Sequence, residues 1–171
     1  MTKQDFKTWL DIAQGFVVIL GVIVGLYQLK VQSDTLEATR AIESGKFILE
    51  LSKDVNDKES NGLMSTLEDH DENFHVLKSR GGRYSDSDIE YYIGHFETLG
   101  DLQKRKLVDL GMAYNEFSYD VEKAWCNKDI RLHIDEARMD DKNSGNTFFT
   151  NFESLAKSFL KRDKKEDCRN I

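Results

Sequence analysis

The sequence predicts an all-α protein in which a single N-terminal transmembrane helix continues into a helical stalk and a small helical bundle. Three observations support this fold class. The chain of 171 residues contains no proline. No charged residue lies between Asp11 and Lys30. After Lys30, apolar residues recur at helical spacing, and no stretch alternates with a period of two for long enough to predict a strand.

Composition excludes several classes of protein. The chain carries 24 Lys and Arg against 31 Asp and Glu, a formal net charge of −7. This acidic balance argues against duplex DNA as a partner, because phosphate binding requires a positive field. With 39% hydrophobic and 32% charged residues the chain is not a polytopic membrane protein. Its two cysteines, Cys126 and Cys168, lie far apart, look unpaired and cannot make a disulfide scaffold.

The transmembrane prediction concerns residues 9–29. The uncharged run Ile12–Leu29 reaches roughly 27 Å as a helix, close to the bilayer core of about 30 Å. Trp9 and Tyr27 lie near its ends, where aromatic belts occur. A cleaved signal peptide is the alternative, but its apolar region is shorter and is followed by small residues. The pattern therefore favours a membrane anchor.

One face of this helix collects small and polar residues. Gln14, Gly21, Gly25 and Gln28 form a single stripe together with Val18, and the two glycines make a GxxxG motif. Glycines let two backbones approach in lipid, and glutamine amides prefer a protein partner to acyl chains. We expect a helix–helix interface in a homo-oligomer. The alternative is that glycine is simply common in membrane helices.

The soluble part is expected to contain one domain. The predicted boundaries are an N-terminal tail at 1–8, the transmembrane helix at 9–29, a stalk at 30–57, a helical domain at 58–161 and a charged tail at 162–171. The polar run Asp54–Gly62 predicts a loop, and a helix is expected at about Leu63–Lys78. Ser87 and Glu90 have the spacing of a capping box at the start of the next helix. Three more helices are expected at about 109–126, 129–140 and 148–160.

Flanking charges leave the orientation close to a tie. Lys3, Lys7 and the α-amino group precede the apolar run, whereas Lys30, Arg40 and Lys46 follow it. Because so short an N-terminal tail is translocated easily, we expect a single-pass protein of the inner or cytoplasmic membrane with its soluble domain in the cytoplasm.

Catalytic motifs are not found, so we predict a protein that is not an enzyme and needs no metal or cofactor. The chain contains no P-loop, GxSxG or GxGxxG motif, and its four histidines do not have zinc-site spacing. Glu72 and His75 make one ExxH unit, but di-iron bundles require two. His133 and Glu136 are expected on a solvated helix face. A nucleophilic role for Cys126 has little support.

Four basic residues form a candidate anion site. Arg80 and Arg83 flank a glycine pair, and Lys104 and Arg105 lie late in the following helix. If they converge, arginine forks and free N–H groups at the glycines would hold phosphate. The alternative is a solvated surface in which the late helix charges complement the helix dipole.

Three segments carry a resemblance to a known family. They are WLDIAQGFVVILGVIVGLYQLKVQSDTLEATRA at the anchor, FETLGDLQKRKLVDLGMAYNEFSYDVEKAW at 96–125, and NFESLAKSFL near the end. The chain resembles an uncharacterised bacterial family of small proteins with one N-terminal membrane helix and a helical domain of unknown function. In layout only, it is also similar to membrane-anchored effectors of bacterial antiviral defence, some of which sense a cyclic oligonucleotide.

Two functions are therefore expected. The first is a non-catalytic, membrane-anchored interaction or sensing protein that acts as an oligomer. The alternative is an antiviral defence effector whose cytosolic domain binds an anionic nucleotide signal, which is cyclic in some of the effectors that it resembles, and whose membrane helices disturb the bilayer.

Overall fold

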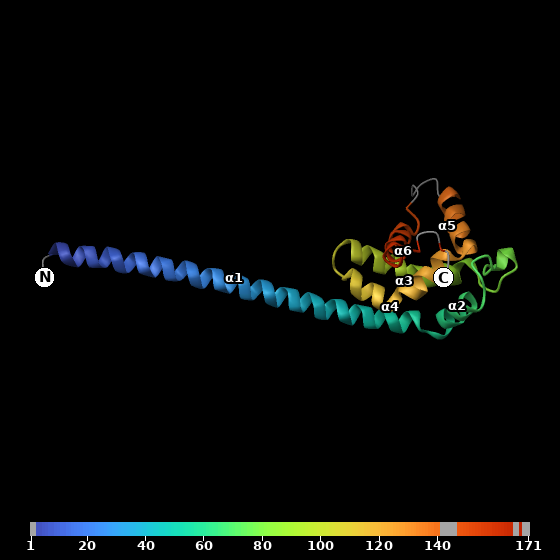
Figure 1. Cartoon of the computed structure of the whole chain (residues 1–171), viewed down its shortest axis with the longest axis horizontal. Helices are drawn as coiled ribbons and strands as arrows, with labels where there is room; N and C mark the ends of the chain where they lie inside the picture. The colour runs from blue at the N-terminus through green and yellow to red at the C-terminus, as the bar shows by residue number, and fades with distance from the viewer. Residues whose placement is uncertain (1–2, 141–146, 166–167, 169–171) are drawn as a thin grey trace. The chain divides into compact units, whose positions relative to one another are not determined.

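The computed structural model describes residues 3–140, 147–165 and 168, and this part of the chain is helical without a β-strand (Figure 1). This confirms the predicted all-α fold class. The chain divides into two compact units, residues 1–42 and 43–171. The helices are α1 (Lys3–Val55), α2 (Lys58–Asp69), a short 3₁₀ helix (Lys78–Arg80), α3 (Asp86–Lys104), α4 (Leu110–Cys126), α5 (Lys128–Asp140) and α6 (Thr150–Asp163).

Helix α1 runs without a break from the apolar segment into the expected stalk. Large apolar side chains between Phe16 and Leu29 are each more than half exposed, down to 52% for Val24. Such a continuous apolar surface is unusual for a helix in water. From Gln14 onward the helix is long and apolar enough to cross a membrane.

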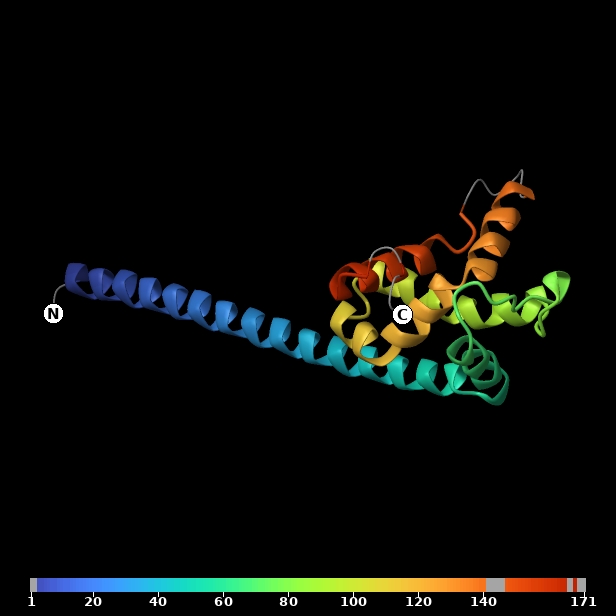
Figure 2. The same ribbon diagram turned by 45° about the vertical axis from the view of Figure 1, so that its right-hand side comes forward.

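The core of residues 43–171 is built around α3, α4 and α6, which pack on one another, while α2 and α5 each contact α4 (Figure 2). Aromatic rings fill the centre. Phe96 from α3 lies 6.1 Å from Phe117 of α4 and 6.0 Å from Phe152 of α6, measured between ring centroids. All three side chains are buried, in keeping with the helical spacing of apolar residues in the sequence.

Helices α3 and α6 approach closely at Gly100. A Cβ atom at this position would lie 2.5 Å from the backbone oxygen of Asn151, so only glycine fits. One turn earlier, the Glu97 carboxylate accepts hydrogen bonds from the Phe152 backbone N–H at 2.6 Å and the Asn151 side-chain amide at 2.8 Å. Glu97 thereby caps the start of α6 from a neighbouring helix.

Two boundaries differ from the sequence prediction. Residues 54–62 are not a loop, because α1 ends at Val55 and α2 already begins at Lys58. The Asp57 carboxylate accepts a hydrogen bond from the Ser60 N–H at 2.7 Å and so starts α2 early. The same helix ends at Asp69, earlier than expected, and Asp71 then forms a turn by accepting from the Asn73 N–H at 2.8 Å.

The capping box of α3 is present but begins two residues earlier than predicted. Ser85, not Ser87, is the N-cap residue, and its hydroxyl accepts from the Asp88 N–H. The Asp88 carboxylate in turn accepts from the Ser85 N–H at 2.7 Å. Both serines have an acidic residue three positions later, so the motif alone does not distinguish them.

The two cysteines are paired, which corrects the expectation that they are free. Cys126, the last residue of α4, forms a disulfide with Cys168, with 5.5 Å between the Cα atoms. Cys126 is therefore no candidate nucleophile in this state, because a disulfide sulfur carries no thiolate.

Candidate ligand-binding cavity

Arg80, the first of the predicted anion-binding residues, is held by two carboxylates of the protein. Its guanidinium donates to Asp129 at 2.8 Å and also to Glu136. The Asp129 side chain is 1% exposed and accepts two further bonds, from the Val76 and Leu77 N–H groups at 2.9 Å each. Arg80 therefore fixes the segment before α3 and has little charge left for a ligand.

The environment of Asp129 keeps it ionised. Burial acts to raise the pKa of this carboxyl group, but the hydrogen bonds from Leu77 and Arg80 outweigh it and hold the pKa below its usual value. Through these bonds the buried Asp129 carboxylate, in the first turn of α5, holds the segment between α2 and α3 against the start of α5.

The four basic residues do not converge. Lys104 and Arg105 lie at the end of α3, and Arg83 precedes its start. At about 1.5 Å per residue the helix separates the two pairs by roughly 27 Å. Arg105 also pairs with Asp101 on its own helix at 2.8 Å. Arg83 lines a cavity between α2 and α3.

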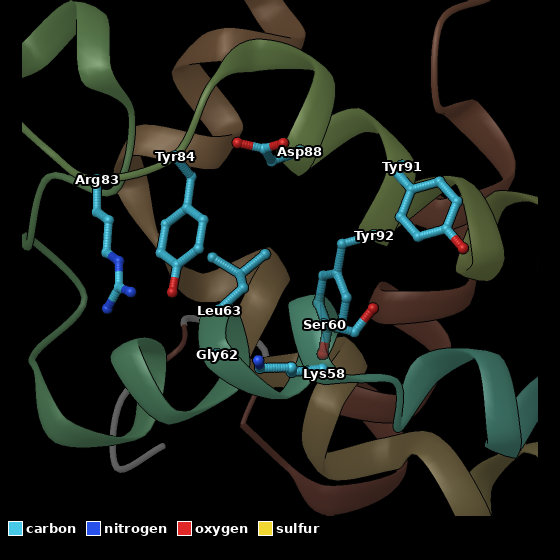
Figure 3. Close-up of a pocket in the computed structure, with 9 residues that line it drawn as sticks. All are labelled: Lys58, Ser60, Gly62, Leu63, Arg83, Tyr84, Asp88, Tyr91 and Tyr92. Atoms are coloured by element: carbon cyan, nitrogen blue, oxygen red, sulfur yellow. The ribbon is translucent and has the colours of Figure 1, made fainter.

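That cavity has a volume of about 550 Å³ and lies between the first turns of α2 and the start of α3 (Figure 3). Helix α2 contributes its N-terminal residues, and α3 contributes its first two turns. Arg83 and Tyr84 come from the segment just before α3. The lining residues are Lys58, Ser60, Gly62, Leu63, Arg83, Tyr84, Asp88, Tyr91 and Tyr92.

Three tyrosines give the cavity its aromatic character. The Tyr84 hydroxyl lies 3.1 Å from the Thr66 hydroxyl, which holds its ring against α2. Tyr92 is buried and donates to Asp120 at 3.3 Å, and burial together with this acid raises the pKa of Tyr92 well above its usual value. Tyr91, by contrast, is 53% exposed and offers its ring to the solvent side.

Two cations give the cavity its positive charge. The Arg83 guanidinium lies 5.9 Å from the centre of the Tyr84 ring, and Figure 3 shows it beside that ring, while Lys58 extends toward Gly62 and Leu63. Within the described residues neither cation has an ion-pair partner. Asp88, the one acid of the lining, is engaged in the α3 cap. The cavity can therefore attract an anion and stack a ring.

Sequence reasoning found Arg83 but missed Lys58, Tyr84 and Tyr91. No motif singled out Tyr84 or Tyr91, and Lys58 lies within the predicted loop at 54–62, where the structure instead begins α2. His133 was also misplaced: it is buried rather than solvated, and its Nε2 lies 3.0 Å from Glu90. The glycine stripe lies on α1, where Gly21 and Gly25 have open space beside them.

These features define an all-α protein with one N-terminal helix long and apolar enough to span a membrane. The chain belongs to the family described as Domain of unknown function (DUF4760), which matches residues 15–159. This match confirms the resemblance to an uncharacterised family with an apolar N-terminal helix and a helical domain. Comparison with curated proteins found no match, and comparison with solved structures found none either.

Proposed function

We propose that the protein is a membrane-anchored, non-catalytic sensing protein that binds a small anionic ligand in the cavity between α2 and α3 and acts as an oligomer through α1. The observation that supports it is that Lys58 and Arg83, which have no ion-pair partner within the described part of the chain, lie beside exposed tyrosine surface in a cavity of about 550 Å³. This volume is within the usual range for small-molecule sites.

A second function remains as a proposal because of the same cavity. A nucleotide carries phosphates that suit Lys58 and Arg83 and a base that suits a tyrosine ring. In this alternative the protein is a defence effector, and nucleotide binding would lead the α1 helices to disturb the bilayer.

Thermal unfolding of the full-length protein in detergent tests ligand binding. Mononucleotides and cyclic oligonucleotides are the probes, and a ligand at a hundredfold excess over its Kd adds about 2.7 kcal/mol to the stability. We expect the rise in Tm to be lost in Lys58→Gln and Arg83→Gln. The matched control is Arg105→Gln, which removes the same charge from an exposed site at the other end of α3. An equal response in all three variants would contradict the proposal.

Dye-filled liposomes separate the two functions. If a nucleotide that raises the Tm also releases dye from liposomes containing the protein, the effector function is supported. If the nucleotide binds without release, the sensing function is supported. The Arg83→Gln protein serves as the control, because release that persists in it does not depend on the cavity.

The anchor has its own test. The proposal requires the full-length chain to sediment with membranes and to resist washing with alkaline carbonate, since the apolar surface of α1 is exposed to its surroundings. Recovery of the full-length chain in the soluble fraction would contradict the anchor.

The side of the membrane on which residues 43–171 lie is part of the proposal. Flanking charges leave the two orientations close to a tie, with three positive groups on each side of the apolar run. The Cys126–Cys168 disulfide favours an oxidising compartment, because thiols in the cytosol are kept reduced. For the sensing protein we propose that the domain lies outside the cytoplasm, whereas the effector alternative, whose domain is cytosolic, requires the opposite side.

Trapping thiols in acid-quenched cells distinguishes the two sides. With a maleimide reagent that adds visible mass, we expect no label on the native chain and one label on Cys126→Ser, whose Cys168 has lost its partner. Two labels on the native chain would instead place the domain in the cytoplasm, the side expected from the sequence.

A further inference from the structure

A second cavity, of about 360 Å³, lies among α5, α6 and the end of α4. Trp125 comes from α4, Arg131 and Arg138 from α5, and Glu153 and Lys157 from α6. Cys168 of the disulfide also lines it. None of these residues belongs to the cavity between α2 and α3, so the two cavities can be tested separately.

The acids around this cavity are committed to two of its three cations. Glu153 lies 2.9 Å from Arg138 and 2.5 Å from Lys157. Asp135 lies 3.9 Å from Arg138. Arg131 is half-buried and has no ion-pair or side-chain hydrogen-bond partner among the described residues.

Two arginine nitrogens at this cavity are buried without an acceptor among the residues that the structure describes. They are Nε of Arg131 and one terminal nitrogen, NH2, of Arg138. The rest of the Arg138 guanidinium is well bonded, since its Nε donates to the Phe148 carbonyl at 2.8 Å. A buried, charged donor without an acceptor is costly to the fold, so the same positions gain most from an incoming acceptor.

We propose that this cavity binds an oxyanion group of a small molecule, a phosphate or a carboxylate, with Arg131 and Arg138 as its hydrogen-bond donors. The guanidinium fork matches both kinds of oxyanion in geometry and charge. The cavity is larger than one oxyanion, which leaves room for a further part of the ligand beside Trp125. This inference does not depend on the function proposed for the cavity between α2 and α3.

Trp125 supplies a local signal for the experiment. The chain has two tryptophans, so Trp9→Phe leaves Trp125 alone, with the Lys157 ammonium 5.9 Å from its ring centre. The full-length protein in detergent is titrated with sodium phosphate and, separately, with sodium citrate, while sodium chloride keeps the ionic strength equal. We expect a saturable change in Trp125 emission and a raised Tm with at least one of the two anions. A response to phosphate indicates a phosphoryl ligand, and a response to citrate indicates a carboxylate ligand.

Variants of Arg131 decide whether the signal comes from the proposed donors. Arg131→Gln is expected to weaken the apparent affinity about tenfold or more, as loss of one charged hydrogen bond predicts. Arg131→Lys keeps the charge without the fork and is expected to bind more weakly than the parent, and it serves if the glutamine variant does not fold. Arg105→Gln, which lines neither of the two cavities, should respond like the parent. The proposal is overturned if neither anion gives a response beyond chloride, or if the Arg131 variants respond like the parent.

Discussion

At the residue scale, Asp129 organises the segment that leads into α3. One buried carboxylate receives the N–H groups of Val76 and Leu77 and the guanidinium of Arg80. The same arginine also reaches Glu136, whose side chain is 55% exposed. Two carboxylates of different burial thus share one cation, and comparing them isolates the effect of burial.

We expect Asp129→Asn to lower the free energy of unfolding by about 3 kcal/mol, because the amide keeps one acceptor oxygen and leaves either Arg80 or the two backbone N–H groups without an acceptor in a buried place. Glu136→Gln removes the exposed partner and should cost less than about 1 kcal/mol. Thermal unfolding of the full-length variants in detergent measures both. Equal losses would mean that burial of Asp129 contributes nothing.

Asp129 also predicts a dependence on pH. Its pKa is lowered in the folded state, so its contribution is complete above the unfolded pKa of about 3.9 and is lost as the pH falls through the folded pKa. We expect the stability difference between the parent and Asp129→Asn to be constant near neutral pH and to shrink below about pH 4. A difference that grows on acidification would contradict the assignment of a lowered pKa.

At the element scale, the contact of α3 with α6 depends on one glycine. We expect Gly100→Ala to cost about 2 kcal/mol, since its Cβ would meet the Asn151 backbone, which has little room to move. Gly94 is the matched control on the same helix: no atom lies within 4 Å of a Cβ there. Gly94→Ala should raise stability by about 0.5 kcal/mol through helix propensity. Melting temperatures measured by circular dichroism test both changes. Similar shifts for the two variants would contradict the close approach of α3 and α6 at Gly100.

At the scale of the whole molecule, α1 carries the predicted assembly. A Cβ at Gly21 or Gly25 meets no atom of the described chain, so larger side chains there do not clash within one protomer. We expect Gly21→Ile with Gly25→Ile to reduce crosslinking in membranes, because the added bulk separates the helices. Ile23→Leu, which lies on the opposite face of the helix, should crosslink like the parent. Equal crosslinking in all variants would contradict the prediction that Gly21 and Gly25 form the oligomer interface.

Much of the helical architecture is predictable from the sequence because its causes are local. The uncharged run before Lys30 predicts the exposed apolar helix. The helical spacing of apolar residues within each later helix predicts the buried faces to which Phe96, Phe117 and Phe152 belong. Helix ends are less certain, since Ser85 and Ser87 offer the same capping signal and only packing selects Ser85. The family resemblance is also readable from the chain, and the match to residues 15–159 confirms it.

The candidate sites are decided by tertiary structure, because their partners are distant in sequence. Arg80 pairs with Asp129, 49 residues away, and is therefore not available for the predicted anion site. Lys104 and Arg105 are separated from Arg83 by the length of α3. Cys126 meets Cys168 across 42 residues. Periodicity records which face of a helix is buried, whereas ion pairs, disulfides and cavities depend on which faces meet. Local sequence patterns predict the helices and the long apolar N-terminal segment, whereas packing decides which charges are neutralised and which lie beside a cavity.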